Sequence, residues 1–380
     1  MRKKILVISV GIWPPAVKMA GTAAIYNLLK LLAQKGIFEI HILTALPSWS
    51  DSNTDQWAKR QKVEYGLTFH FVKAENLFWT RILLFLKAVE LCRRFNFALI
   101  HEYSGAPALV GLTGILGRIG HCRTVHTLCV TNDDWWRALF PSPFKRYAGR
   151  SLNKIIITSP KLEMGFRSGR VVYLPLGIDV DKFSTTKIGS VRSSILFLGP
   201  LTERKGAFVL LKAVRDVVEK NPQVKFVFAT YGREVRDPNY RINKKRFGRI
   251  AAGFRENVEL LGGLQDVPRL MAGVGIFVLP ATSLYGTLSP PLTLLEAMGS
   301  GKACVVSDVC RGDGLVEDEV NCLLFRSGDA EDLAAKIDLL LGDKALRKKL
   351  ATNARQKVVK EFDINKVAEK LLELYKEILP

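Results

Sequence analysis

Short apolar runs alternate with longer amphipathic segments along most of the chain. Lys4–Ser9 is the first run, and Thr22–Gln34 then repeats apolar residues at helical spacing and stops at Gly36. Runs of roughly four to eight apolar residues are typical of buried strands, and apolar positions three and four apart are typical of helices. A regular order of strand and helix predicts a parallel sheet with helices on both faces.

The same rhythm continues through two series of elements. The first series is expected to contain strands at Ile37–Thr44, Val63–Val72, Ala98–His101, Thr124–Leu128 and Lys154–Thr158, with helices at Leu77–Arg94 and Val110–Arg118. The second is expected to contain strands at Ser194–Leu198, Lys225–Thr230, Asn257–Leu261, Gly275–Leu279 and Ala303–Ser307, with helices at Gly206–Glu219, Asp329–Leu341, Lys344–Phe362 and Asn365–Ile378. Together they indicate an α/β protein with two doubly wound, Rossmann-like domains.

The domain boundary is expected in the polar connection that ends Val171–Phe183. A chain of 380 residues is too long for one typical core, so two domains are the natural expectation. We expect one domain over 1–178, a second over 179–362 and a final helix over 363–380. Ligands of doubly wound domains bind at the carboxyl ends of the strands, which predicts a site in a cleft between the domains.

Basic residues outnumber acidic ones, 56 to 36, for a net charge of +20. The excess is uneven, because residues 1–180 contain 24 basic and 11 acidic side chains. A basic half indicates an anionic partner, which is nucleic acid, a phosphorylated substrate or an anionic membrane surface. A basic surface that only faces solvent and binds no partner would explain the same excess of basic residues.

Membrane-spanning and disulfide-linked classes are not favoured. No run reaches the roughly 18 apolar residues of a membrane span, and the opening MRKKILVISVGIW fits a buried first strand better than a signal peptide. The six cysteines form no CxxC pair and show no zinc-like spacing with histidine, which favours a reduced compartment.

The segment Leu284–Asp308 carries the most specific pattern in the chain. An apolar strand ends, a helix opens after a double proline, glycines close that helix, and another apolar strand begins. Glu296 lies near the start of the helix. Backbone N–H groups at a helix start favour a diphosphate, and an acid one turn further can accept hydrogen bonds from sugar hydroxyls. This layout suits a nucleotide-diphosphate donor.

Within it, Pro290–Lys302, reading PPLTLLEAMGSGK, resembles the nucleotide-sugar signature of the family 4 glycosyltransferases. The resemblance covers nearly the whole chain. It implies the GT-B architecture, in which two Rossmann-like domains face a central cleft and the C-terminal helix crosses back to the first domain. It also implies that Glu296 holds the nucleotide ribose, with further donor contacts from Ser289, Leu292 and Thr293.

The signature also departs from the family. Family members carry a first acid eight residues before the second, where it touches the donor sugar, and this position holds Leu288. Two extra residues lengthen the loop between Ser283 and Glu296. These differences bear on the identity of the sugar more than on the fold.

Phe197–Gly206, reading FLGPLTERKG, is the second match. The family uses a Gly-Arg pair after the strand, and a lysine at the start of the next helix, to hold the diphosphate. Gly199 and Lys205 correspond, Pro200 replaces the arginine, and Arg204 can supply the second charge. Cations in a dry cleft stabilise the charge that develops on a leaving diphosphate, by roughly 3 to 4 kcal/mol for one oxyanion donor.

The N-terminal half carries weaker acceptor-side and donor-side candidates. Lys18 precedes a helix that Gly21 opens, and one glycine is a weak match to the family's glycine-rich loop. His126 alternates with apolar neighbours in its strand, while Cys129 stands where family members often carry a histidine. His101, at the end of the preceding predicted strand, is expected at the edge of the cleft. A packed core residue is the commoner explanation for either histidine.

Aromatic residues interleave with Lys and Arg in Leu77–Arg94 and in Trp135–Arg150. A surface of this kind can lie in a lipid interface. Equally, the segment can pack its aromatic side in the protein core and expose its basic side to solvent. Family members with basic N-terminal domains often act on lipid-linked acceptors. Single-stranded nucleic acids are bound with similar chemistry, but no RRM, KH or OB pattern supports a nucleic-acid partner.

These features predict a retaining, hexosyltransferase-like glycosyltransferase that moves a sugar from a nucleotide-diphosphate donor to a saccharide or lipid-linked acceptor. No Asp-X-Asp pair stands where a metal-dependent enzyme would place it, so no metal and no cofactor are expected. The resemblance implies Lys205 and Glu296 as the catalytic pair. It implies a cytoplasmic protein, with the inner face of the membrane as a further location. The alternative is a catalytically impaired GT-B protein that binds a nucleotide sugar or serves in an assembly, and Pro200, Leu288 and Cys129 favour it.

Overall fold

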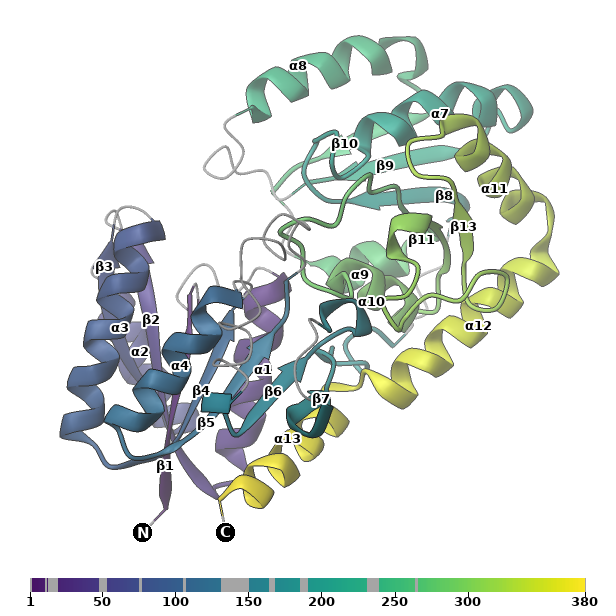
Figure 1. The fold of residues 1–380 in the computed structure, drawn as a ribbon. Helices are drawn as coiled ribbons and strands as arrows, with labels where there is room; N and C mark the ends of the chain where they lie inside the picture. The colour runs from purple at the N-terminus through teal and green to yellow at the C-terminus, as the bar shows by residue number, and fades with distance from the viewer. Residues whose placement is uncertain are drawn as a thin grey trace. The chain divides into compact units, whose positions relative to one another are not determined.

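The computed structural model describes residues 2–10, 12, 20–47, 53–74, 77–104, 107–130, 150–163, 168–184, 191–230, 239–263 and 266–379. These residues form two compact units (Figure 1). Unit 1 contains 1–177, 285–289 and 364–380, and unit 2 contains 178–284 and 290–363. The expectation of two doubly wound α/β domains is confirmed.

Unit 1 is built on a parallel sheet of seven strands in the order β3-β2-β1-β4-β5-β6-β7. Its strands are β1 (Lys3–Ser9), β2 (Phe38–Pro47), β3 (Leu67–Ala74), β4 (Phe97–Ser104), β5 (Arg123–Leu128), β6 (Lys154–Ile157) and β7 (Val171–Tyr173). Its α-helices are α1 (Ala20–Gln34), α2 (Asn53–Tyr65), α3 (Leu77–Arg94), α4 (Pro107–Ile119) and α13 (Ile364–Ile378). The C-terminal helix therefore belongs to the first unit, as expected.

Unit 2 is built on a parallel sheet of six strands in the order β10-β9-β8-β11-β12-β13. Its strands are β8 (Val191–Leu198), β9 (Lys225–Ala229), β10 (Val258–Leu261), β11 (Val274–Leu279), β12 (Ala303–Ser307) and β13 (Leu323–Phe325). Its α-helices are α7 (Ala207–Lys220), α8 (Tyr240–Ala251), α9 (Val267–Ala272), α10 (Leu292–Gly299), α11 (Ala330–Gly342) and α12 (Lys344–Glu361).

Both cores follow from the apolar runs. In unit 1, Leu6, Ile8 and Ile100 pack against the apolar faces of α3 and α4. In unit 2, Phe197 and Phe228 lie with residues of α7, α8 and α11 in one buried cluster. Strands buried on both faces read as near-continuous apolar segments, which is why most of them could be located from sequence.

Two differences from the expected elements concern the first unit. The predicted strand Val63–Val72 is wrong in its first part, because Asn53–Tyr65 is helix α2 and the strand begins at Leu67 after Gly66. Gly66 has a φ of +72°, a conformation that ends a helix and that side chains disfavour. The predicted strand Ala98–His101 extends to Ser104.

Gly206 shows how tightly the loop after β8 is packed. Its φ is +72°, and a Cβ atom there would lie 1.6 Å from the carbonyl oxygen of Pro280. We expect Gly206→Ala to lower the free energy of unfolding by more than the roughly 1–2 kcal/mol of the left-handed conformation alone. Gly248→Ala in α8 is the control, because a Cβ atom there would have no neighbour within 4 Å. The better helix propensity of alanine should raise the free energy of unfolding of this variant by roughly 0.5–1 kcal/mol. Urea unfolding of both variants measures the difference, and equal changes would contradict this packing.

Candidate functional site

In unit 2, the loops that follow β8 and β11 lie side by side. The two strands are neighbours, and from them the chain winds outward in opposite directions along the sheet. The backbone N–H of Thr282 donates to the carbonyl oxygen of Arg204 over 3.0 Å, and the Thr282 hydroxyl donates to the carbonyl of Glu203 over 3.2 Å. Ligands of doubly wound sheets bind at the point where strand order reverses, so this loop pair is the candidate site of unit 2.

Lys205 lies in the first of these loops, directly before α7. Its backbone N–H donates to the Thr202 hydroxyl over 3.2 Å, which fixes the turn, and its side chain is partly buried. Burial, reinforced by the neighbouring Arg204, lowers the pKa of Lys205 to about 8. The side chain is therefore still mostly cationic at neutral pH, and an anionic ligand would stabilise that charge. The side chain of Arg204 is exposed.

Glu296 lies on α10, which begins directly after Pro291. Its Oε2 is shielded from solvent and has no hydrogen-bond partner among the described residues. Burial raises the pKa of Glu296 to about 8. A buried carboxyl oxygen without a donor is costly unless a ligand supplies one, so this atom is suited to hydroxyl groups that donate to it.

The other predicted donor residues are divided between the units. Gly199 is buried at the end of β8, where its N–H donates to the carbonyl of Ala229 over 3.0 Å. Leu292 and Thr293 form the first turn of α10 in unit 2. Ser289 lies in unit 1, fully buried, and Gly21 lies in the first turn of α1 in the same unit. Lys18 lies outside the described residues.

The segment 285–289 is held in unit 1 by backbone contacts. The N–H of Ser289 donates to the carbonyl of Cys129 over 3.1 Å, and the Thr158 hydroxyl donates to the carbonyl of Ser289 over 2.6 Å. Leu288 and Val130 form an antiparallel bridge. The segment 285–289, which holds Leu288 where the family carries its first acid, thus packs beyond the carboxyl ends of β5 and β6 within unit 1.

His101 lies inside unit 1 rather than at the end of its strand. It is fully buried, with Nδ1 2.5 Å from the Tyr375 hydroxyl and Nε2 2.6 Å from the Thr127 hydroxyl. Burial lowers the pKa of His101 well below its ordinary value, so the ring is neutral. These contacts link α13 to β4, and both ring nitrogens of His101 have partners within unit 1.

His126 belongs to a second buried network, on the opposite face of the sheet. Its Nδ1 lies 2.9 Å from the Thr113 hydroxyl, and its Nε2 lies 3.0 Å from the Ser104 hydroxyl. Thr113 in turn donates to Glu102 over 2.5 Å. Sequence reasoning missed Glu102, Thr113 and Ser104. A carboxylate within a strand that is buried along most of its length was the one available signal for Glu102.

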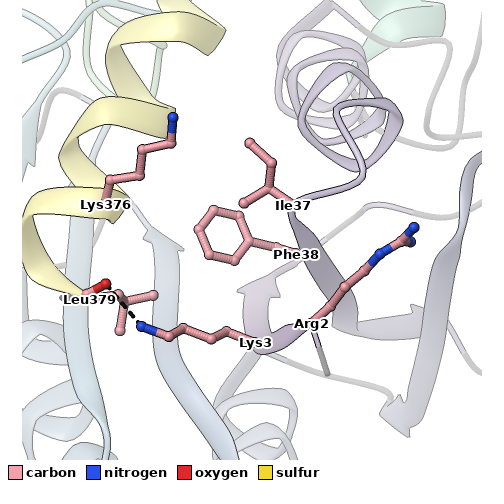
Figure 2. Close-up of a pocket in the computed structure, with 6 residues that line it drawn as sticks. All are labelled: Arg2, Lys3, Ile37, Phe38, Lys376 and Leu379. Atoms are coloured by element: carbon pink, nitrogen blue, oxygen red, sulfur yellow. Dashed lines mark hydrogen bonds between the residues drawn. The ribbon is translucent and has the colours of Figure 1, made fainter.

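Outside the predicted site, one pocket of about 550 Å³ opens in unit 1 at the amino ends of β1 and β2. Figure 2 shows its lining, which consists of Arg2, Lys3, Ile37, Phe38, Lys376 and Leu379. Lys3 Nζ donates to the carbonyl of Leu379 over 3.0 Å. The pocket contains none of the predicted site residues.

Within the described ranges, no group of three or more His, Cys, Asp or Glu side chains is placed to hold a metal ion. In the same ranges, no helix combines the length and the apolar character needed to cross a bilayer.

Curated relatives share between a quarter and two fifths of their residues with this chain over the matched parts. An Escherichia coli UDP-Gal:alpha-D-GlcNAc-diphosphoundecaprenol alpha-1,3-galactosyltransferase is 27% identical over 54% of each chain. A Campylobacter jejuni N,N'-diacetylbacillosaminyl-diphospho-undecaprenol alpha-1,3-N-acetylgalactosaminyltransferase is 38% identical over 32% of this chain and 31% of its own. A Mycolicibacterium smegmatis phosphatidyl-myo-inositol mannosyltransferase is 27% identical over 75% of this chain and 72% of its own. The chain thus spans about half or less of the length of the first two relatives.

Solved structures match nearly the whole chain. The Anabaena protein HepE in complex with UDP has a TM-score of 0.74 at 17% identity and covers 99% of this chain and 100% of its own. A glycosyltransferase from Rickettsia africae has a TM-score of 0.76 at 19% identity, and the match covers 100% of this chain and 99% of the Rickettsia chain. At these identities the likeness shows the fold alone, and the expected GT-B fold is confirmed.

Models of known families match both halves of the chain. Residues 22–182 match the model described as Glycosyltransferase Family 4, and residues 192–343 match the model described as Glycosyl transferases group 1. The two matches together cover most of both units. The chain therefore belongs to the family 4 glycosyltransferases.

Proposed function

We propose that this protein is a retaining glycosyltransferase that moves a sugar from a nucleotide-diphosphate donor to a saccharide or lipid-linked acceptor. The observation that carries the proposal is the loop pair of unit 2. Lys205 provides a partly buried cation in the loop between β8 and α7, and Glu296 provides a shielded carboxyl oxygen on the helix after the neighbouring strand. A nucleotide diphosphate offers the two complementary groups, an anionic diphosphate and ribose hydroxyls that donate.

The donor is proposed to be a UDP-sugar. The name of the Escherichia coli relative specifies UDP-Gal, and HepE was solved with UDP. The acceptor is proposed to carry a diphospho-lipid, because the names of two relatives specify diphosphoundecaprenol carriers.

Charge stabilisation is the chemical role that the site supports. As the glycosidic bond breaks, negative charge grows on the leaving diphosphate, and the Lys205 ammonium stabilises it. Gly199, Arg204 and the first turn of α10, with Leu292 and Thr293, complete the proposed donor site. In the retaining mechanism that the family implies, attack and departure occur on one face of the sugar, and the leaving phosphate takes the acceptor proton.

A thermal-shift screen against UDP-, GDP- and ADP-sugars tests the proposal. A ligand present at 100 times its dissociation constant should add about 2.7 kcal/mol of stability. We expect UDP-sugars to raise the melting temperature most. Absence of a shift with every nucleotide sugar would contradict the donor assignment. A shift without transfer to any acceptor would favour the catalytically impaired alternative, for which Pro200, Leu288 and Cys129 are the supporting features.

Attachment to an anionic membrane is proposed for unit 1, at the inner face of the membrane. On helix α3, the side chains of Trp79 and Leu86 are 53% and 57% exposed. They are seven residues apart and therefore lie on one side of the helix, where Arg93 is also exposed. Phe85 is half-buried, and Trp135 and Trp136 lie outside the described residues. Each Lys or Arg near an anionic leaflet contributes about 1 kcal/mol, so binding should be reversible and sensitive to salt.

Vesicle flotation at low and high salt measures this attachment. We expect recovery with anionic vesicles only, and a loss of it when Trp79→Ser is combined with Leu86→Ser. Helix α8, which has five basic residues and no acidic one, is the competing surface, and Lys244→Glu with Lys245→Glu tests it. The exposed pair Lys348 and Lys349 on α12 provides the matched control. Equal recovery with neutral vesicles would remove the electrostatic argument, and no binding to either would favour a soluble acceptor.

A further inference from the structure

The buried network around His126 links an acidic group in the interior to a hydroxyl at the carboxyl end of β4. Ser104 is the last residue of that strand and is only partly buried. β4 lies beside β1, where the strand order of unit 1 reverses. Ligands of doubly wound sheets bind at this position, so Ser104 lies where a ligand of unit 1 is expected.

Four side chains from three elements form one continuous chain of hydrogen bonds. Glu102 and Ser104 come from β4, Thr113 from α4 and His126 from β5. The successive distances are 2.5 Å from Thr113 to Glu102 Oε2, 2.9 Å from Thr113 to His126 Nδ1, and 3.0 Å from His126 Nε2 to Ser104. His126 is fully buried and Glu102 is 8% exposed, so water does not readily replace these contacts.

The directions of these three bonds are coupled to the proton at Glu102, because each hydroxyl has one proton to donate. When Glu102 is ionised, it accepts the Thr113 hydroxyl, the Thr113 oxygen accepts Nδ1–H of His126, and Nε2 accepts the Ser104 hydroxyl. When Glu102 is protonated, it donates to Thr113, Thr113 donates to Nδ1, and Nε2–H donates to Ser104. The added proton is the only change in composition, and the imidazole stays neutral and changes only its tautomer.

We propose that Glu102, Thr113 and His126 are a positioning relay that sets whether the Ser104 hydroxyl offers a lone pair or a proton to a hydroxyl of the sugar acceptor. The identity of that ligand rests on the proposed function, whereas the relay itself rests only on the contacts within unit 1. With Glu102 ionised, Ser104 donates inward and its oxygen accepts a hydrogen bond from the acceptor hydroxyl.

The electrostatic surroundings place the change of direction near neutral pH. The charged or titratable groups that face Glu102 are Arg81 from α3 and His126 from β5, whose Nδ1 is 3.9 Å away. α4 contributes the neutral Thr113, and β1 contributes the apolar Ile8. Burial raises the pKa of Glu102 to about 7, against opposing effects of Thr113 and Arg81. Burial also lowers the pKa of His126 to about 3, which keeps the ring neutral.

Nitrogen NMR of the full-length protein tests the relay without any need for activity. The five histidines are labelled, and His126 is assigned by comparison with His126→Gln. We expect the proton of His126 to lie on Nε2 at pH 5.5 and on Nδ1 at pH 8.5. Glu102→Gln, whose amide donates to Thr113, should keep it on Nε2 at both pH values. A tautomer that does not change with pH in the wild-type protein would overturn the relay.

The acceptor role is tested separately by kinetics. Thr113→Val removes the middle of the chain at nearly constant volume, and Thr113→Ser restores the hydroxyl. We expect Thr113→Val to abolish the pH dependence of the tautomer and to raise KM for the acceptor roughly 2- to 10-fold, with donor affinity unchanged. Thr113→Ser should restore both. An unchanged acceptor KM in Thr113→Val would overturn the positioning role. A pH-dependent tautomer in a protein that transfers no sugar would leave the relay intact and contradict only the proposed function.

Discussion

Replacing Glu296 by alanine is expected to weaken binding of a UDP-sugar by roughly one to two decades. The shielded Oε2 has no donor among the described residues, and two ribose hydroxyls would supply donors to it. A hydrogen bond to a charged group contributes about 1.5–3 kcal/mol. Isothermal titration measures the change, and circular dichroism shows whether the fold is retained. Wild-type affinity in Glu296→Ala would contradict the ribose assignment.

The same residue should make donor affinity depend on pH. Glu296 has a pKa of about 8 in the free protein, and hydroxyl donors favour its ionised form. Affinity for UDP-glucose should therefore rise with pH up to about 8, by at most tenfold per unit. Glu296→Gln should flatten this rise. UDP-glucose is the suitable ligand because its diphosphate does not titrate in this range.

Stability should change in the opposite direction. The folded-state pKa of Glu296 lies above the ordinary value of 4.5, so its contribution to the free energy of unfolding is fully present below pH 4.5. That contribution is lost as the pH rises through 8. Since Glu102 contributes with the same sign, the difference between wild type and Glu296→Gln isolates the effect of Glu296. A difference that is constant with pH would show that Glu296 titrates normally.

Replacing Lys205 by alanine should act mainly on turnover. Its interaction with the diphosphate strengthens as charge develops on the leaving group, so kcat should fall more than KM rises. The loss of one such donor typically costs roughly 100- to 1000-fold in kcat. Arg204→Ala is the matched comparison, because its side chain is exposed next to Lys205. Wild-type turnover in Lys205→Ala, with a loss in Arg204→Ala, would place the clamp at Arg204.

Lys205 should also define the alkaline limit of donor binding. Burial lowers its pKa to about 8, so the free protein loses this cation above that pH and affinity should decline. Donor affinity is thus expected to be highest near pH 8. Lys205→Arg, which keeps its charge, should remove the alkaline decline and leave the acidic limb of Glu296 unchanged. An alkaline decline that persists in Lys205→Arg would mean that another group causes it.

Elements with an unbroken apolar pattern could be located from sequence, because burial on both faces of a parallel sheet leaves few polar positions. β12 and α3 were predicted with the bounds that the structure gives them. Helix α2 was missed, because NTDQWAKRQKVEY has few apolar residues to mark a helical face. β13 has three residues, which is too short for a periodic signal.

Donor residues that lie within one continuous sequence motif could be predicted. Residues that are distant in the sequence and come together only in the folded protein could not. Lys205 and Glu296 each lie in a strand–turn–helix segment whose order along the chain already implies the carboxyl end of a sheet. No local pattern indicated that Ser289 would join unit 1, because its partners Cys129 and Thr158 are more than a hundred residues away. The relay of Glu102, Thr113 and His126 likewise depends on the register between β4 and β5, which places Glu102 beside His126. The sequence does not specify this register.

Transfer with retention is the central claim, and the anomeric configuration of the first-formed product tests it most directly. The protein is incubated with a UDP-sugar and a panel of saccharides and diphospho-lipid-linked sugars, and the product is examined by proton NMR before any equilibration. We predict a product with the same anomeric configuration as the donor, formed by the wild-type protein and at least 100-fold more slowly by Lys205→Ala. A product of inverted configuration, or nucleotide-sugar binding without transfer to any acceptor, would contradict the account.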